Sequence, residues 1–227
     1  MTTTTLPDLG GLPVFLSAAV PDALRETPGA LRLQGFVAAF VRGLLAAGGR
    51  LIFGGHPSLT PLVQRVASDF GDRKVDLFQL TRYRDSAPRE IREPQFVLHW
   101  IDGDRLAPMR DLMAEGAEAA VFVGGKTEEE QPADGVPGIR DEFQRFLRRH
   151  PAGPAYVLGL LDGEAARLIA DLEHDSGEPN GLSEAERQAL HHTNDVDLAA
   201  SLVLADLRRL PGRARPREPS SAKSRPR

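Results

Sequence analysis

Short apolar runs alternate with longer stretches of helical periodicity along most of the chain. The short runs are almost continuously hydrophobic, which is typical of strands that are buried on both faces of a parallel sheet. Alternation of such strands with helices predicts an α/β fold that is Rossmann-like, with three layers and a mostly parallel central sheet flanked by helices. The predicted strands are residues 12–17, 50–54, 75–80, 95–100, 119–124 and 155–159.

The stretches between these runs predict the helices. Residues 30–47 place their apolar side chains on one stripe, and Gly48-Gly49 ends this helix where a left-handed residue is favoured. A polar stretch, 173–194, precedes the final helix, which we expect to pack on the domain or on a partner. The other predicted helices are residues 59–70, 106–116, 139–149, 163–172 and 196–210.

Length and composition indicate one globular domain. The chain has 227 residues, of which 41% are hydrophobic and 26% are charged. We expect a flexible N-terminus at 1–10, a Rossmann-like domain at 11–172, a polar connection with a C-terminal helix at 173–210, and a disordered basic tail at 211–227. Apolar positions on the C-terminal helix would suit a homo-oligomer contact.

Several classes of function are not expected. The chain has no cysteine, which excludes disulfides and thiolate sites, and its histidines lack the spacing of a metal site. Since no apolar run approaches the roughly 20 residues that span a bilayer, we expect a cytoplasmic protein without a membrane segment. We also expect neither a metal nor another cofactor. No nucleophile-elbow spacing is present, so acyl transfer has no support.

The charge of the chain is uneven. Residues 211–227 hold six Lys or Arg residues and one Glu, so a formal charge of −4 for the whole chain leaves −9 for residues 1–210. Such a tail is most simply a solubilising end. The acidic body argues against nucleic acid as a partner, because duplex binding needs a basic face.

Candidate ligand-binding residues follow the predicted strands. Ligands of parallel sheets bind beyond the carboxyl ends of the strands. Two glycine pairs, Gly54-Gly55 and Gly124-Gly125, stand there, and glycine permits a close approach of the backbone to a ligand. We expect a nucleotide-sized pocket at this edge. The candidate ligand-binding residues are Ser17, Gly54, Gly55, His56, Ser58, Thr60, Gly124, Gly125, Gly138 and Glu142.

Several of these residues have a structural alternative. The hydroxyls of Ser58 and Thr60 would equally suit the cap of the next helix. His56 would also suit a backbone contact within its own loop. Asp141 and Glu142 stand at the start of a predicted helix, where acidic residues stabilise the helix dipole. The sequence leaves these alternatives open.

Three segments carry a family resemblance. They are VFLSAAVP at 14–21, FGGHPSLTPL at 53–62 and AVFVGG at 120–125. Together they resemble the SLOG superfamily, the Rossmann-like group that contains DprA/Smf and LOG-type proteins, and the chain is most similar to the SLOG cluster 3 type found with prokaryotic conflict systems. The resemblance covers most of residues 11–172. It implies a sensor domain for a nucleotide or a nucleotide-derived, ADP-ribose-like ligand, with a TIR-type or other effector as partner.

The same resemblance implies an alternative activity. LOG-type phosphoribohydrolases carry a Pro-Gly-Gly-x-Gly-Thr-x-x-Glu motif and a preceding helical Arg. Here Gly124-Gly125 matches the glycine pair, and Gly138 and Glu142 recover the rest of the spacing only after the insertion 126–137. Val123 replaces the proline of the motif.

The helical arginine of that motif corresponds to Arg110. If the chain is an enzyme, the resemblance therefore implies a nucleotide N-glycosidase that acts on nucleoside monophosphates, with Glu142 and Arg110 as its catalytic residues. A sensor without catalysis is the leading hypothesis.

Overall fold

The computed structural model describes residues 8–21, 24–85, 89–130, 137–174 and 178–210. The expectation of a disordered tail at 211–227 lies outside the described residues, as does most of the expected flexible N-terminus.

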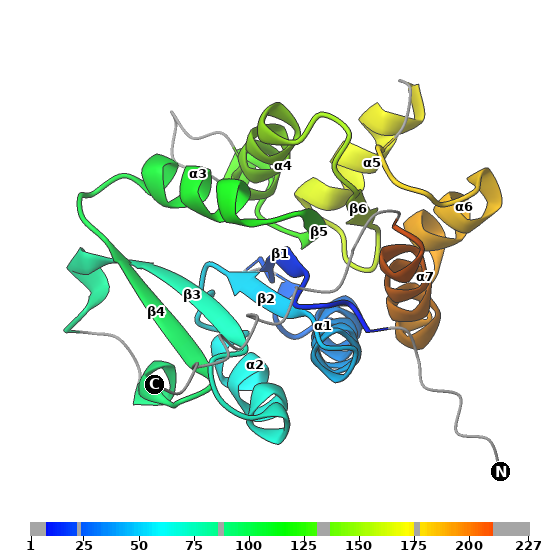
Figure 1. Ribbon diagram of the computed structural model, residues 1–227. Coiled ribbons are helices and arrows are strands. Elements are labelled where there is room, and N and C mark those ends of the chain that lie inside the picture. The colour runs from blue at the N-terminus through cyan, green and yellow to red at the C-terminus, as the bar shows by residue number, and fades with distance from the viewer. Residues whose placement is uncertain (1–7, 22–23, 86–88, 131–136, 175–177, 211–227) are drawn as a thin grey trace, which may run out of the picture.

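Six parallel strands form one sheet in the order β4-β3-β2-β1-β5-β6 (Figure 1). The chain moves outward from β1 to β4 and then returns to the other side of β1 with β5 and β6, so the topological switch point lies between β1 and β5. This arrangement confirms the predicted Rossmann-like α/β fold. The strands are β1 (Pro13–Ala19), β2 (Arg50–Phe53), β3 (Val75–Leu80), β4 (Phe96–Ile101), β5 (Ala119–Gly124) and β6 (Ala155–Leu158).

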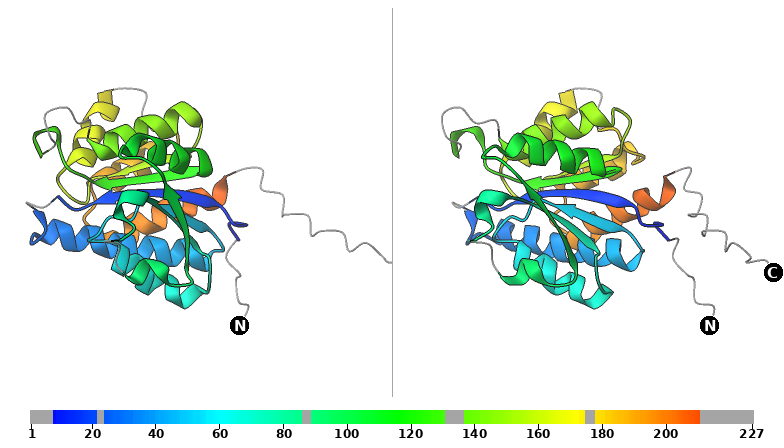
Figure 2. Two further views of the ribbon diagram at one scale, coloured as in Figure 1. Left: turned by 90° about the vertical axis from the view of Figure 1, so that its left-hand side faces the viewer. Right: turned by 60° about the vertical axis from the view of Figure 1, so that its left-hand side comes forward.

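Helices cover both faces of the sheet, as the edge-on views of Figure 2 show. The helices are α1 (Pro28–Ala46), α2 (Thr60–Ala67), α3 (Leu106–Gly116), α4 (Gly138–Arg149), α5 (Glu164–His174), α6 (Glu184–His192) and α7 (Val196–Arg209). Buried side chains of α1, α2 and α7 pack on one face, and those of α3, α4 and α5 pack on the other. The predicted helix 59–70 is α2 followed by a 3₁₀ turn, Ser68–Phe70.

The longest helix, α1, lies in the core. Thr27 caps its start, where its side chain accepts a hydrogen bond from the Ala30 amide. By length and composition α1 could cross a membrane, with a mean hydropathy of 1.3 in its most apolar window. Its apolar side chains instead pack against the sheet, α2 and α7. The apolar character of α1 is therefore that of a core helix.

The polar stretch 173–194 contains a helix that hydrophobic periodicity did not predict. Ser183 and Glu186 form a reciprocal capping box at the start of α6. Upstream of α6, the buried carboxylate of Glu178 accepts a hydrogen bond from the Val157 amide at 3.1 Å. The same carboxylate lies 3.0 Å from His191 Nε2. This segment therefore covers the outer edge of β6, which would otherwise expose unpaired backbone groups.

Candidate functional site

A cavity of about 650 Å³ lies at the carboxyl edge of the sheet. It spans the ends of β3, β2, β1 and β5, and helices α3 and α4 form its far wall. The cavity therefore includes the switch point, where open parallel sheets bind their ligands. Its lining residues from the predicted set are Ser17, Gly54, Gly55, His56, Thr60, Arg110, Gly125, Gly138 and Glu142.

Three side chains from three different elements meet in this cavity. The hydroxyl of Ser17, in the carboxyl-terminal half of β1, donates to Glu142 Oε2 on α4. Arg110, on α3, donates from Nε to Glu142 Oε1 at 3.0 Å. The Arg110 and Glu142 side chains are only 17% and 15% exposed. The Glu142 carboxyl is thus held from both sides in a largely water-excluded place.

Burial is the dominant influence on Glu142. It raises the pKa of the Glu142 carboxyl above its ordinary value, although the charge of Arg110 and the hydrogen bonds from Ser17 and Arg110 favour the ionised form. A carboxyl with a raised pKa holds its proton more readily. Such a group suits general acid–base chemistry, and when protonated it also donates a hydrogen bond to a ligand.

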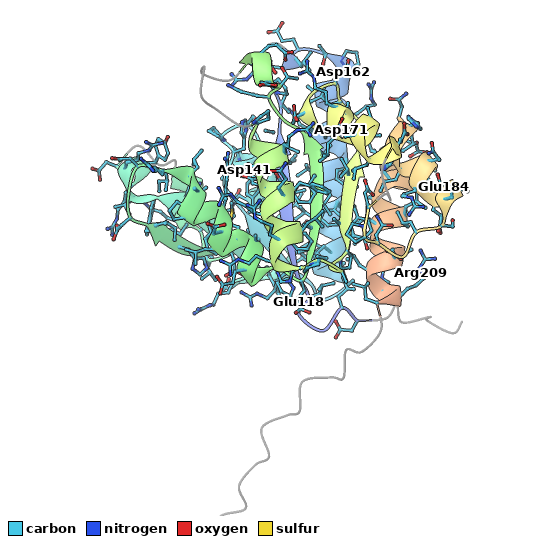
Figure 3. All side chains as sticks on the ribbon, turned by 90° about the horizontal axis from the view of Figure 1, so that it is seen from above. Glu118, Asp141, Asp162, Asp171, Glu184 and Arg209 are labelled. Carbon is cyan, nitrogen blue, oxygen red and sulfur yellow. The ribbon has the colours of Figure 1, made fainter. Side chains whose placement is uncertain are left out.

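Arg110 is fixed by a second carboxylate. Its Nη1 donates to Asp141 Oδ2 at 2.9 Å, and Asp141 also accepts from Arg145 Nε at 2.9 Å. Arg145 in turn donates from Nη1 to Asp111 Oδ1 at 2.7 Å. Figure 3 shows Asp141 on α4. This chain of ion pairs between α3 and α4 sets the direction of the Arg110 guanidinium.

Asp141 and Glu142 are neighbours with opposite pKa shifts. Burial alone would raise the pKa of Asp141, but the hydrogen bonds and charges of Arg145 and Arg110 outweigh burial and lower the pKa. Both carboxylates make specific side-chain contacts, so they do more than complement the dipole of α4. Asp141 stays ionised and holds Arg110, whereas Glu142 faces the cavity.

The first glycine pair is tied to β3 by a glutamine. Gln79 Nε2 donates to the Gly54 carbonyl oxygen at 2.8 Å and lies 3.5 Å from that of Gly55. Gly55 has φ +72°, and a Cβ built on it would lie 2.0 Å from Gln79 Nε2. Only glycine therefore fits at Gly55 without moving the glutamine.

The residues after this pair organise their own turn. His56 Nδ1 lies 2.7 Å from the hydroxyl of Ser58, and Thr60 donates from its hydroxyl to the His56 carbonyl oxygen at 2.9 Å. His56 and Thr60 line the cavity, and Ser58 is not among the lining residues. Ser58 thus orients the imidazole, while Thr60 fastens the start of α2 to the turn.

The second glycine pair divides its roles between packing and the cavity. A Cβ on Gly124, with φ +71°, would lie 2.4 Å from the Ala19 carbonyl oxygen, so Gly124 permits close packing of β5 on β1. It is not among the lining residues. Gly125 lines the cavity and donates its amide to the same Ala19 oxygen at 2.8 Å.

The two halves of the split motif come together in space. A Cβ on Gly125 would lie 2.2 Å from Ile139 Cγ1, so the turn after β5 directly touches the start of α4. A Cβ on Gly138 would lie 2.8 Å from Arg110 Nη2. The insertion 126–137 therefore separates Gly125 from Gly138 along the chain without separating them in the fold.

Sequence reasoning missed many of the lining residues, among them one glutamine, one lysine and two methionines. Gln79 is a polar residue near the carboxyl end of β3, and that position was the available signal. Lys126 directly follows the second glycine pair. Met109 and Met113 lie on the α3 face toward the cavity, and both touch the position that a Cβ on Gly54 would take. Among the described residues, no group of three or more His, Cys, Asp or Glu side chains could hold a metal ion.

Fold and site together define a Rossmann-like domain with a ligand-sized cavity at the switch point of its sheet. Residues 24–194 match the profile of the SLOG cluster3 family, and the chain belongs to that family. This match confirms the resemblance carried by the three sequence segments.

The comparison with solved structures supports the fold. No curated protein matches the chain. The X-ray structure of TM1055, a target of the Northeast Structural Genomics Consortium, aligns with a TM-score of 0.55 at 15% sequence identity. The alignment covers 85% of this chain and 98% of TM1055. At this identity the likeness supports the Rossmann-like architecture alone.

Proposed function

We propose that the protein is a sensor domain that binds a nucleotide or a nucleotide-derived, ADP-ribose-like ligand in the cavity at the carboxyl edge of the sheet. The observation that carries the proposal is a cavity of about 650 Å³ at the switch point, whose wall combines glycine turns with the Ser17, Glu142 and Arg110 side chains. Its volume is within the range of small-molecule sites.

The polar groups of the cavity suit the parts of a nucleotide. Arg110 and Lys126 are cations that would attract phosphate, although residues 1–210 as a whole are acidic. Arg110 Nη2 makes no hydrogen bond within the described part of the chain, and it lies beside Gly138, which has no side chain to cover it. Glu142 would accept ribose hydroxyls.

Titration calorimetry tests the proposal with AMP, ADP, ADP-ribose and NAD at millimolar concentrations. We expect at least one of them to bind, and Lys126→Gln to weaken that binding about three- to tenfold through loss of a phosphate contact. Lys74→Gln is the matched control, because Lys74 precedes β3 at the opposite edge of the sheet. If none of the four compounds binds, the proposal is wrong.

A second candidate function is a nucleotide N-glycosidase of the LOG type. It is favoured by the side-by-side placement of Gly125, Gly138 and Glu142, which restores in space the motif that the insertion divides. In such a hydrolysis the bond from ribose C1′ to the base breaks, the base leaves with the electron pair and takes up a proton, and water adds its oxygen to C1′. Glu142 would assist at C1′, and Arg110 would hold the phosphate.

Chromatography of the products separates the two functions. Release of free base from AMP, CMP, GMP or UMP, lost in Glu142→Gln while the variant stays folded, would establish the hydrolase. Binding without release would establish the sensor.

The proposed cellular role is based on the family resemblance. We propose that the domain acts in the cytoplasm, in a bacterial conflict or stress-signalling system, and passes the ligand signal to a TIR-type or other effector, with homo-oligomerisation as one way to do so. Light scattering with and without the bound nucleotide tests the oligomer step, and an unchanged mass with the ligand bound would contradict it.

A further inference from the structure

The cavity has two ends of different chemistry. The end near β1, β5 and α4 holds the charged groups Glu142, Arg110 and Lys126. The end near β2 and β3 is lined by the apolar side chains of Leu80, Tyr83 and Ile91. Tyr83 remains 44% exposed, even though Arg82 lies over its ring at 4.7 Å. An exposed aromatic side chain in an apolar recess suits a flat ring.

One amide stands in the apolar end, and its orientation is fixed. The side-chain nitrogen of Gln79 faces two carbonyl oxygens, those of Gly54 and Gly55. The reversed amide would place an acceptor against two acceptors, so only the nitrogen fits there. Gln79 Oε1 must therefore point away from the glycine turn.

That oxygen is open to the cavity. Within the described residues Gln79 Oε1 accepts no hydrogen bond. Since it is also not a buried polar atom left without a partner, it is accessible to solvent. Gln79 lines the cavity. The apolar end therefore presents an acceptor whose amide cannot turn to present a donor instead.

We propose that the apolar end receives the heterocyclic ring of the ligand, and that Gln79 Oε1 selects rings with an amino group at the facing edge over rings with a carbonyl there. A facing carbonyl would leave two acceptors opposed without a proton between them, and both would lose their water. Gln79 is thus a specificity-determining residue. This inference rests on the proposed nucleotide binding.

Two pairs of nucleotides test it in solution. AMP and IMP differ by an amino group against a carbonyl on the same ring, and CMP and UMP differ in the same way. By calorimetry we expect the amino compound of at least one pair to bind about tenfold more tightly. In Gln79→Met this ratio should fall to near one, whereas Gln188→Met, on α6 outside the cavity, should keep it.

The ratio distinguishes selection from a structural effect. Gln79→Met also releases the Gly54-Gly55 turn, and a loosened turn would weaken both members of a pair alike. If the wild-type protein binds both members of each pair equally, or binds the carbonyl compounds more tightly, the inference is overturned and the proposed function still stands. A preference unchanged in Gln79→Met would also overturn it. Failure of all four compounds, together with ADP, ADP-ribose and NAD, would overturn the proposed function as well.

Discussion

Arg110 Nε and Glu142 Oε1 lie 3.0 Å apart although 32 positions separate the two residues in the chain. The contact joins α3 to α4, and the chain between these helices includes β5 and the connection 125–137, which contains the insertion. Packing of the two helices, rather than the local sequence around the glycine pair, therefore positions the carboxyl in the cavity. This arrangement tolerates an insertion that a compact local motif would not.

Loss of Arg110 should destabilise the fold. Arg110→Met leaves the buried Glu142 carboxyl and the Asp141 carboxylate without their shared cation, and we expect the free energy of unfolding in urea to fall by about 2 kcal/mol. In the double variant Arg110→Met/Glu142→Gln, the cost should be smaller than the sum of the two single costs, because the unpaired carboxyl is gone.

An exposed ion pair between α3 and α4 gives the control. Arg149 and Glu115 lie 3.8 Å apart with side chains 49% and 62% exposed. Arg149→Met should cost less than about 0.5 kcal/mol, since exposed pairs contribute little. Equal costs for Arg110→Met and Arg149→Met would contradict the special role of the cavity pair.

The neighbouring carboxyls should show opposite dependence on pH. The pKa of Glu142 is raised from 4.5 in the folded protein, so its ionisation opposes folding, and stability falls as the pH rises above that value. The pKa of Asp141 is lowered from 3.8, so its stabilisation is present above this pH and is lost as the pH falls below it.

Urea titrations from about pH 3 to pH 8 measure both effects. The loss in free energy of unfolding caused by Glu142→Gln should decrease as the pH rises above 4.5. The loss caused by Asp141→Asn should increase as the pH rises through 3.8. If the loss in free energy of unfolding changes with pH in the same direction for both variants, the environments of these two carboxyls do not differ as described.

Two glycines with similar backbone angles should differ in their tolerance of alanine. Gly71 and Gly124 have φ +83° and +71°, but a Cβ on Gly71 meets nothing within 4 Å, whereas a Cβ on Gly124 meets the Ala19 carbonyl oxygen at 2.4 Å. Gly71→Ala should cost about 1 kcal/mol from backbone strain alone. Gly124→Ala should cost at least 1 kcal/mol more, since β5 must move away from β1.

The strands were predictable because strands buried on both faces leave a nearly continuous apolar run in the sequence. Residues 75–80 and 119–124 were predicted with the bounds that β3 and β5 have. Helix α6 was missed because its apolar face is small and most of its residues are polar. The pair Ser183 and Glu186 was the available signal, since this spacing is that of a capping box.

The site was predictable only in part, for a related reason. Residues that follow strands could be placed at one edge of the sheet, which brought Ser17, Gly55 and Gly125 together. The role of Gln79 depends on the pairing of β2 with β3, which puts its amide against the first glycine turn, and no local pattern encodes that contact. Arg110 was predicted from the family resemblance, but its contact with Glu142 depends on the packing of α3 on α4.

The last prediction concerns the first glycine pair. A Cβ on Gly54 would meet Met113 at 3.5 Å, an ordinary contact, and Gly54 does not have a positive φ. Gly54→Ala should therefore change the free energy of unfolding by less than about 0.5 kcal/mol. Gly55→Ala combines φ +72° with a Cβ 2.0 Å from Gln79 Nε2, and it should cost about 2 to 3 kcal/mol.

A double-mutant cycle separates the two causes in Gly55→Ala. In a Gln79→Ala background the amide that meets the new Cβ is absent, so Gly55→Ala should cost about 1 kcal/mol less than in the wild type. The remaining cost comes from the positive φ and from Leu77 Cδ1, which lies 2.9 Å from the same Cβ position. If the costs of Gly55→Ala and Gln79→Ala simply add in the double variant, the Gln79 amide does not contact the Gly55 turn as described, because residues in contact are expected to show a coupling energy.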